Sequence, residues 1–237
     1  LAQRWSCPLV GVVHGYDFDV GLELKGVGDR VRSAAACCDA LVCASQRLAD
    51  LVQYRGVDAR RVETIPCLTD VDREWRQPVR PMKKAWKKEP IDILFPADPR
   101  RPEKRHLLAL QTGEVLEGRG WVVGITTLRH QPRSIVFDRM LTADVTLITS
   151  RREAGPLVAR ESLMCGTPVV SVDVGEVGRY LPEEWVHGDD PEALADGIEH
   201  ALRHGWQSED TVDERLAFAS LEAVSQAWTG LLSSLVS

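Results

Sequence analysis

The stretch DVTLITSRREAGPLVARESLMCGTPVVSVD, residues 144–173, decides the fold. Five of its first six residues, VTLIT after Asp144, are apolar or β-branched and predict a buried strand, and the polar SRREAG with its glycine predicts a turn. PLVARESLMC predicts a helix, because Pro156 suits a first helical turn and Gly166 follows the last one. TPVVSVD predicts the next strand. This order of strand, helix and strand predicts a parallel α/β sheet.

Two carboxylates frame this unit, Glu153 in the turn and Glu161 in the helix, with seven residues between them. In open α/β sheets ligands bind beyond the carboxyl ends of the strands, and a helix N-terminus exposes N–H groups that hold anions. Glu161 would then accept hydrogen bonds from sugar hydroxyls, and Glu153 would reach the other side of the ligand. A structural unit with two surface glutamates is the alternative. The residues expected to hold a phosphate are Gly155, Pro156, Leu157 and Val158.

Composition excludes several classes of protein. The 237 residues suffice for one large domain or two small ones, and 44% hydrophobic with 27% charged residues is typical of a soluble globular protein. A net charge of -6 disfavours nucleic acid as a partner. No apolar run is long enough to span a membrane, and no signal peptide is visible. Six cysteines without paired or zinc-like spacing predict a reduced, cytoplasmic setting.

The rest of the chain repeats the alternation of strands and helices, which predicts a parallel sheet with crossover helices. Ser45 is a candidate N-cap and Gly56 a candidate C-cap of one helix, and Asp190 or Asp189 caps another. The expected strands are 8–15, 40–45, 62–66, 91–96 and 121–128, and the expected helices are about 27–38, 45–56, from about 103, 135–143, and from Pro191. A last amphipathic helix carries Leu216, Phe218, Leu221, Val224, Trp228 and Leu231 along one side.

The segment from Glu153 to Ser171, E-A-G-P-L-V-A-R-E-S-L-M-C-G-T-P-V-V-S, resembles the donor-site signature of retaining GT-B glycosyltransferases, family 4 above all. That signature is Glu, seven residues, Glu, a small residue, Gly, any residue, Pro and Val. The resemblance covers roughly residues 8–182. It implies two Rossmann-like parallel-sheet domains: a partial, acceptor-side N-terminal domain over 1–72, a linker over 73–89, and a nucleotide-sugar-binding domain over 90–237, whose last helix packs back on the first domain.

The N-terminal domain is truncated relative to the resembled family, in which several βα units precede the strand that carries His14. Those units normally bear much of the acceptor site. The chain also begins with Leu1 and not Met, which fits a fragment or a processed form.

The resemblance also assigns roles to particular residues. His14, in H-G-x-D with Gly15 and Asp17, lines the reacting face, and Asp17 lies on the acceptor side. FPADPRRPEK resembles the family variant FPSxPxRPEKNF, whose Arg and Lys reach the donor diphosphate; Lys104 aligns with the Lys, and Arg101, or else Arg100, with the Arg. Fixed cations there stabilise the charge that develops on a departing nucleoside diphosphate. Glu161 would bind the ribose and Glu153 the donor sugar.

Other features carry weaker hypotheses. Arg129 and His130 follow the strand 121–128 near the expected base site. Asp17 with Asp19, and Asp70 with Asp72, spell D-x-D, a metal motif of GT-A enzymes, yet nothing else is GT-A-like, so no metal is expected. Residues 73–89 hold seven Lys or Arg and two Trp. They predict either a solvated connection or a contact with anionic lipid at the inner membrane surface.

The sequence therefore predicts a retaining, metal-independent glycosyltransferase that moves a sugar from a nucleotide sugar, UDP- or GDP-linked, to an acceptor hydroxyl. The acceptor, a glycan, a lipid-linked group or a small molecule, is not determined, nor is the oligomeric state. A non-catalytic nucleotide-sugar-binding protein, or a partner subunit of a split enzyme, is the first alternative. An epimerase or phosphorylase of the same fold is the second.

Overall fold

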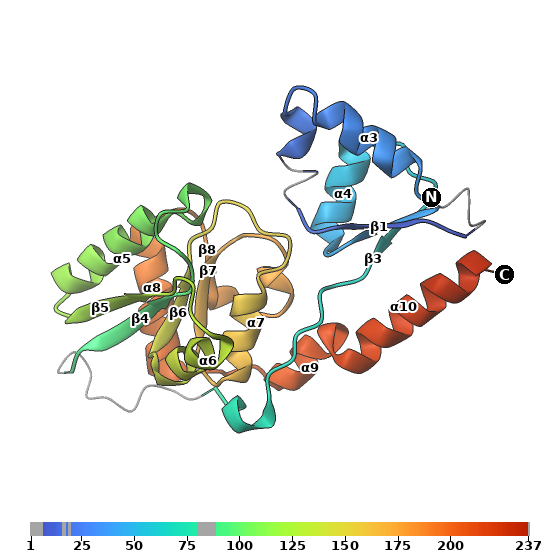
Figure 1. The fold of residues 1–237 in the computed structure, drawn as a ribbon. Coiled ribbons are helices and arrows are strands. Elements are labelled where there is room, and N and C mark those ends of the chain that lie inside the picture. The colour runs from blue at the N-terminus through green and yellow to red at the C-terminus, as the bar shows by residue number, and fades with distance from the viewer. Residues whose placement is uncertain (1–6, 16–17, 19, 80–88, 237) are drawn as a thin grey trace. The chain divides into compact units, whose positions relative to one another are not determined.

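The computed structural model of the protein describes residues 7–15, 18, 20–79 and 89–236. The chain divides into two compact units (Figure 1). The first unit joins residues 1–68 to residues 218–237, and the second unit comprises residues 69–217. The sequence had placed the boundaries at residues 72 and 89, and the structure assigns the segment that follows residue 68 to the second unit.

The first unit is built on a parallel sheet in the order β1-β2-β3. β2 is buried at every position, which explains its unbroken apolar run ALVC. The Ser45 hydroxyl accepts a hydrogen bond from the Leu48 N–H and confirms Ser45 as an N-cap, whereas the C-cap is Arg55, and Gly56 follows it at φ +61°. The elements are β1 (Val10–Val13), α3 (Gly28–Ala36), β2 (Ala40–Cys43), α4 (Gln46–Tyr54), β3 (Val62–Thr64) and α10 (Leu221–Val236).

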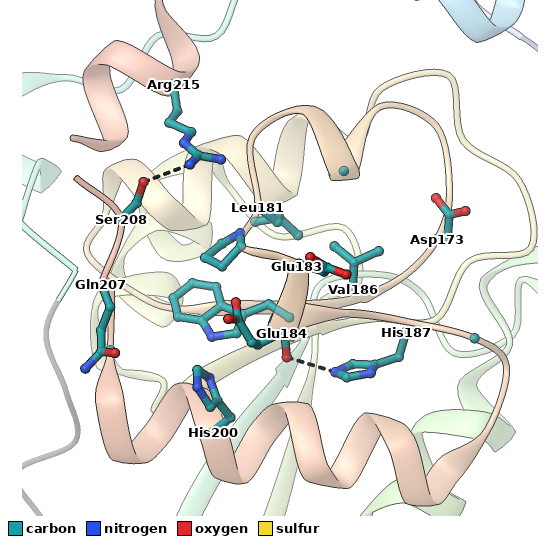
Figure 2. Close-up of a pocket in the computed structure, with 15 residues that line it drawn as sticks. Asp173, Leu181, Glu183, Glu184, Val186, His187, His200, Gln207, Ser208 and Arg215 are labelled. Atoms are coloured by element: carbon teal, nitrogen blue, oxygen red, sulfur yellow. Dashed lines mark hydrogen bonds between the residues drawn. The ribbon is translucent and has the colours of Figure 1, made fainter. Parts of the chain in front are cut away.

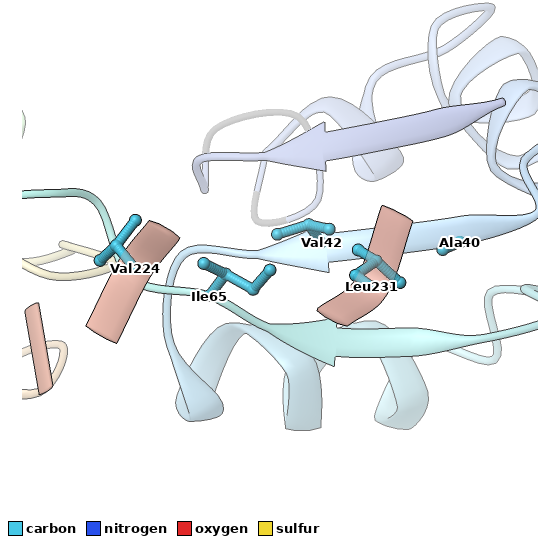
Figure 3. Close-up of a cluster of buried hydrophobic side chains, with 5 residues drawn as sticks. All are labelled: Ala40, Val42, Ile65, Val224 and Leu231. Atoms are coloured by element: carbon cyan, nitrogen blue, oxygen red, sulfur yellow. The ribbon is translucent and has the colours of Figure 1, made fainter. Parts of the chain in front are cut away.

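Helix α10 completes the core of the first unit (Figure 3). Val224 and Leu231 of α10 pack on Ala40 and Val42 of β2 and on Ile65 after β3. Arg61 also donates a 2.7 Å hydrogen bond to Ser234. Helix α10 therefore belongs to the core of the first unit.

The prediction of one continuous final helix is wrong. The segment forms α9 (Val212–Leu216), a 3₁₀ turn and then α10, because two separate caps start two helices. Thr211 and Glu214 form a capping box before α9, and the Ser220 hydroxyl accepts from the Ala223 N–H at the start of α10. The predicted stripe is also broken, since Leu221 is 63% exposed.

The second unit contains a five-stranded parallel sheet in the order β5-β4-β6-β7-β8. Its helices cover both faces, α5 packing beside α8 and α6 beside α7. The Asp190 carboxylate caps α8, which settles the choice between Asp189 and Asp190. The elements are β4 (Ile91–Phe95), α5 (His106–Gly118), β5 (Val123–Thr127), α6 (Arg133–Thr142), β6 (Val145–Ile148), α7 (Leu157–Met164), β7 (Val169–Val172), β8 (Val186–His187) and α8 (Pro191–His204).

Helix α5 begins later than the sequence predicts. Residues Pro102–Lys104 form a 3₁₀ turn, and α5 starts at His106. The cause is Arg105, whose φ of 52° is left-handed and interrupts a continuous helix.

The strand order reverses beside β4. The chain passes from β4 outward to β5 and then returns to the other side of β4, where β6 pairs with it at Ile93 and Val145. In open α/β sheets ligands bind beyond the carboxyl ends of the strands, at the point where the strand order reverses. The loops at this switch point are residues 96–105 and 149–156.

The start of the predicted linker belongs to the second unit. The Trp75 ring lies 5.1 Å from the Phe137 ring, and its Nε1 donates to Asp138 at 3.2 Å. The Lys-rich residues 80–88, including Trp86, lie outside the described residues. No helix in the described part of the chain is long and apolar enough to cross a membrane.

Candidate functional site

The two loops at the switch point are held together by hydrogen bonds. The Thr149 hydroxyl donates to the carbonyl oxygens of Lys104, at 2.7 Å, and Arg105, at 3.1 Å. The Arg151 N–H donates to the Glu103 carbonyl at 2.8 Å. The loop after β4 and the loop after β6 therefore form one surface at the carboxyl ends of the strands.

Lys104 and Glu153, two predicted site residues, are brought together on this surface. The Lys104 Nζ donates to Glu153 Oε1, and the two side chains are only 16% and 18% exposed. The donor-side cation and the sugar-side carboxylate therefore meet although 49 positions separate them in the sequence.

Arg105 is a residue of this surface that sequence reasoning missed. Its side chain is 14% exposed, and its Nε donates to the Thr149 carbonyl at 2.6 Å. Its guanidinium also holds the Asp189 carboxylate in a two-pronged contact and lowers the pKa of that carboxyl. Its position directly after Lys104 is the one feature of the sequence that could have indicated a role for Arg105 at this surface. Arg105 fastens three segments, the loops after β4, β6 and β8.

Arg100 and Arg101 lie on the same loop, each with a carboxylate partner. Arg100 contacts Asp98 at 2.7 Å, and Arg101 contacts Glu103 at 2.5 Å. The hydrogen bond from Arg100 lowers the pKa of Asp98 far below its usual range. Arg129 lies 3.6 Å from the same Asp98, so the structure brings Arg129 and Arg100 together.

The local charge of this surface differs in sign from that of the whole chain. Residues 98–105 and 149–155 contain six Lys or Arg and three Asp or Glu, whereas the chain carries a net charge of -6. An excess of cations at the carboxyl ends of a parallel sheet attracts anions. The surface is suited to a phosphate-bearing ligand.

The loop before α7 is fixed by a glycine from the next connection. Gly175 has φ +58°, and a Cβ there would lie 2.7 Å from the Ala154 carbonyl oxygen and 3.1 Å from that of Glu153. Only glycine at position 175 lets the two backbone segments approach this closely, and this contact positions the segment that carries Glu153. Pro156 is the N-cap of α7, Gly155 precedes it, and Leu157 and Val158 open the helix, where N–H groups lack intrahelical acceptors.

Glu161 forms an ion pair with Arg133, a partner that the sequence did not predict. Its residue is 7% exposed, and its Oε1 lies 3.0 Å from the Arg133 guanidinium of α6. Arg133 also donates to the Asp70 carbonyl at 2.9 Å. Burial of this carboxylate is compensated by an ion pair, which a ligand hydroxyl would have to join or replace.

The other candidate residues from the sequence are His14, Asp17 and His130. His14 belongs to the first unit, where its Nδ1 lies 3.6 Å from the Cys67 sulfur. Asp17 lies outside the described residues, as does Asp19. His130 is exposed with φ 48°. In the described part of the chain, no three His, Cys, Asp or Glu side chains gather as metal ligands.

Comparison with known proteins finds a similarity that lies within the second unit. Residues 123–215 match the family model of glycosyl transferases group 1. The D-inositol 3-phosphate glycosyltransferase of Xylanimonas cellulosilytica is 28% identical over 244 residues, and that of Thermobispora bispora is 32% identical over 117 residues. These matches cover 82% and 40% of this chain.

This glycosyltransferase-like chain spans only part of its relatives, 58% of the Xylanimonas protein and 27% of the Thermobispora protein. Among solved structures, Anabaena HepE in complex with UDP and glucose superposes with a TM-score of 0.71 at 17% identity, over 99% of this chain and 73% of that one. Sucrose-phosphate synthase from Thermosynechococcus elongatus gives 0.64 at 20% identity, over 96% and 67%. The fold is therefore GT-B-like, as the sequence predicted.

Proposed function

We propose that the protein is a glycosyltransferase that binds a nucleotide-sugar donor on the second unit and transfers the sugar to an acceptor hydroxyl. The observation that carries the proposal is Lys104 beside Glu153 at the switch point of the sheet, next to the start of α7. The match of residues 123–215 to glycosyl transferases group 1 supports it independently.

In this proposal the basic residues hold the donor diphosphate. Lys104, Arg101 and Arg100 are each paired with a carboxylate in the structure, so diphosphate binding exchanges a carboxylate oxygen for a phosphate oxygen. As the glycosidic bond breaks, negative charge grows on the leaving phosphate, and fixed cations stabilise this state more than the ground state. Release of Glu153 from Lys104 would leave its carboxylate available to the donor sugar.

The finer features of the reaction are also proposals. Retention and independence of metal follow from the family-4-like signature, and no dedicated base is invoked, because the leaving phosphate helps to deprotonate the incoming hydroxyl. His14 would line the reacting face. We propose UDP as the nucleotide, with GDP as the alternative, because HepE was solved with UDP and shares the fold.

Calorimetric titration tests donor binding with UDP, GDP and ADP as probes. Lys104→Met should weaken binding of the preferred nucleotide by about tenfold to a hundredfold, since hydrogen bonds to charged groups contribute about 1.5–3 kcal/mol. Lys25→Met, at an exposed lysine of the first unit, should bind as the wild type does. Equal affinities of the two variants, or no nucleotide binding to the wild type, would contradict the donor assignment.

A non-catalytic binding protein, or one chain of a split enzyme, is the second candidate, because the chain covers only 58% of the Xylanimonas relative. Nucleotide binding without turnover or hydrolysis of any nucleotide sugar would favour it over the enzyme.

A peripheral contact of residues 73–89 with anionic lipid also stays a proposal. Liposome co-sedimentation tests it, and a variant with Lys83, Lys84, Lys87 and Lys88 changed to Glu should lose any binding that the wild type shows.

A further inference from the structure

Arg105 adopts a backbone conformation that is unfavourable for its residue type. Its φ of 52° lies in the left-handed region, which glycine enters without steric cost and a residue with a Cβ does not. Such a conformation persists only where the surrounding structure fixes it, and residues of this kind cluster at functional sites. The contacts that hold Arg105 in this conformation therefore indicate its role.

Hydrogen bonds run in both directions between Arg105 and Thr149. The Thr149 hydroxyl donates to the Arg105 carbonyl at 3.1 Å, and the Arg105 Nε donates to the Thr149 carbonyl at 2.6 Å. The same hydroxyl donates to the carbonyl of Lys104 at 2.7 Å. The loop that leads to Glu153 cannot move away from the backbone of Lys104 without breaking all of these bonds.

Asp189, the carboxylate partner of Arg105, lies on a segment that is itself held in place. Its side chain is 69% exposed, but the chain is fixed before and after it. Before it, the His187 ring forms a 2.9 Å hydrogen bond with the Glu184 carbonyl (Figure 2). After it, the Asp190 carboxylate caps helix α8. The guanidinium of Arg105 is therefore held between the loop after β6 and the loop after β8.

The guanidinium of Arg105 uses all three of its nitrogens on protein acceptors. Nη1 and Nη2 contact the Asp189 carboxylate, and Nη2 also lies 3.5 Å from the Ser150 carbonyl oxygen. The neighbouring Lys104, paired with Glu153, is a point charge on a flexible stem. A cation of that kind has a defined position only where its backbone is fixed. Arg105 therefore acts on the site through Lys104.

We propose that Arg105 is a positioning residue of the donor site, which fixes Lys104 and Glu153 relative to each other without touching the donor. This inference rests on the proposed function, in which Lys104 holds the donor diphosphate. A preorganised cation stabilises the charge on a leaving phosphate without reorganising during the reaction. Loss of the Arg105 guanidinium should therefore weaken the contact with the diphosphate and leave contacts with the nucleoside unchanged.

Arg105→Gly removes the guanidinium and preserves the turn, because glycine adopts a φ of 52° without strain. The first measurement is hydrogen exchange by mass spectrometry on the full chain without ligand. We expect faster exchange in residues 149–155 of the variant, because the Arg151 N–H, which donates to the Glu103 carbonyl, opens more often when the loop is freed.

Arg119→Ala is the matched control. Arg119 follows α5, at the opposite end of that helix from Arg105, and its side chain is 25% exposed and pairs with carboxylates of α8. This variant should leave exchange in residues 149–155 as it is in the wild type. Equal exchange there in Arg105→Gly and Arg119→Ala would overturn the proposal.

The second measurement is calorimetric titration with UDP, GDP and ADP and with uridine, guanosine and adenosine. Arg105→Gly should bind the preferred diphosphate about tenfold more weakly, and the matching nucleoside as the wild type does. Arg119→Ala should bind both as the wild type does. In the background of Lys104→Met, Arg105→Gly should cause almost no further loss, because a positioning residue acts through the group that it positions.

Equal losses of affinity for diphosphate and nucleoside in Arg105→Gly would indicate a purely structural role and overturn the proposal. Additive losses in the double variant would do the same, since Arg105 would then act independently of Lys104. No nucleotide binding by the wild type would contradict the donor assignment, and with it the role of Arg105 there. The exchange measurement needs no ligand, so failure of the Arg105 contacts is distinguished from failure of the donor site.

Discussion

Gly175→Ala should loosen the loop that carries Glu153. The wild-type glycine has φ +58°, and a left-handed backbone costs about 1–2 kcal/mol for a residue with a Cβ. The new Cβ would also lie 2.7 Å from the Ala154 carbonyl oxygen, and relief of such an overpacked contact typically costs about 1–3 kcal/mol. Together these effects should lower the free energy of unfolding by about 2–5 kcal/mol, a large part of a usual total of about 5–15 kcal/mol.

The matched control is Gly178→Ala, three residues further along the same connection. A Cβ at residue 178 meets no atom within 4 Å, and Gly178 has no positive φ. Alanine there should be neutral or stabilise by up to about 1 kcal/mol, because it reduces the conformational entropy of the unfolded chain.

Urea unfolding followed by circular dichroism measures both variants, and the calorimetric titration of the preferred nucleotide measures the effect on the site. Relief of the clash moves the backbone of Glu153 and Ala154 away from Gly175, so nucleotide affinity should fall along with stability. If Gly175→Ala unfolds at the same urea concentration as Gly178→Ala, the close backbone contact that we use to explain the loop is incorrect.

Three further predictions concern buried side chains. Leu231→Ala should lower the free energy of unfolding by about 2–5 kcal/mol and speed amide exchange in β2. The control Leu232→Ala, at a site 49% exposed, should change the free energy of unfolding by less than about 0.5 kcal/mol. Equal losses of stability in the two variants would refute the packing of α10 on the first unit. Burial raises the pKa of Cys165 to about 12 and of Cys43 to about 11 from an ordinary value of 9.0, so iodoacetamide should label the exposed Cys7 and Cys37 before them. The neutral Cys165 thiol contributes fully to stability below pH 9, and this contribution is lost as the pH rises toward 12. In Cys165→Ala the free energy of unfolding should therefore fall less steeply above pH 9 than in the wild type. The same fall in both proteins would refute this role of Cys165.

The sequence predicted the local structure well where the signal was local. Ser45 was predicted as a cap, and the second cap was narrowed to Asp189 or Asp190, because a side-chain oxygen before an apolar period satisfies N–H groups within three residues of itself. The strand, helix and strand of residues 144–173 were predicted because hydrophobic periodicity and turn residues act over short distances. The break of the last helix was missed, since its two caps are weaker signals than the apolar stripe that runs across them.

The chain by itself therefore determined the alternation of strands and helices and the spacing of Glu153 and Glu161. Tertiary structure alone decided which charges meet. Lys104 reaches Glu153, Arg105 reaches Asp189, and Arg133 reaches Glu161 across 49, 84 and 28 positions. The order of strands in the sheet sets the first two pairings, because it brings the carboxyl ends of β4, β6 and β8 to one edge, and the packing of α6 on α7 sets the third. No spacing along the sequence encodes that order.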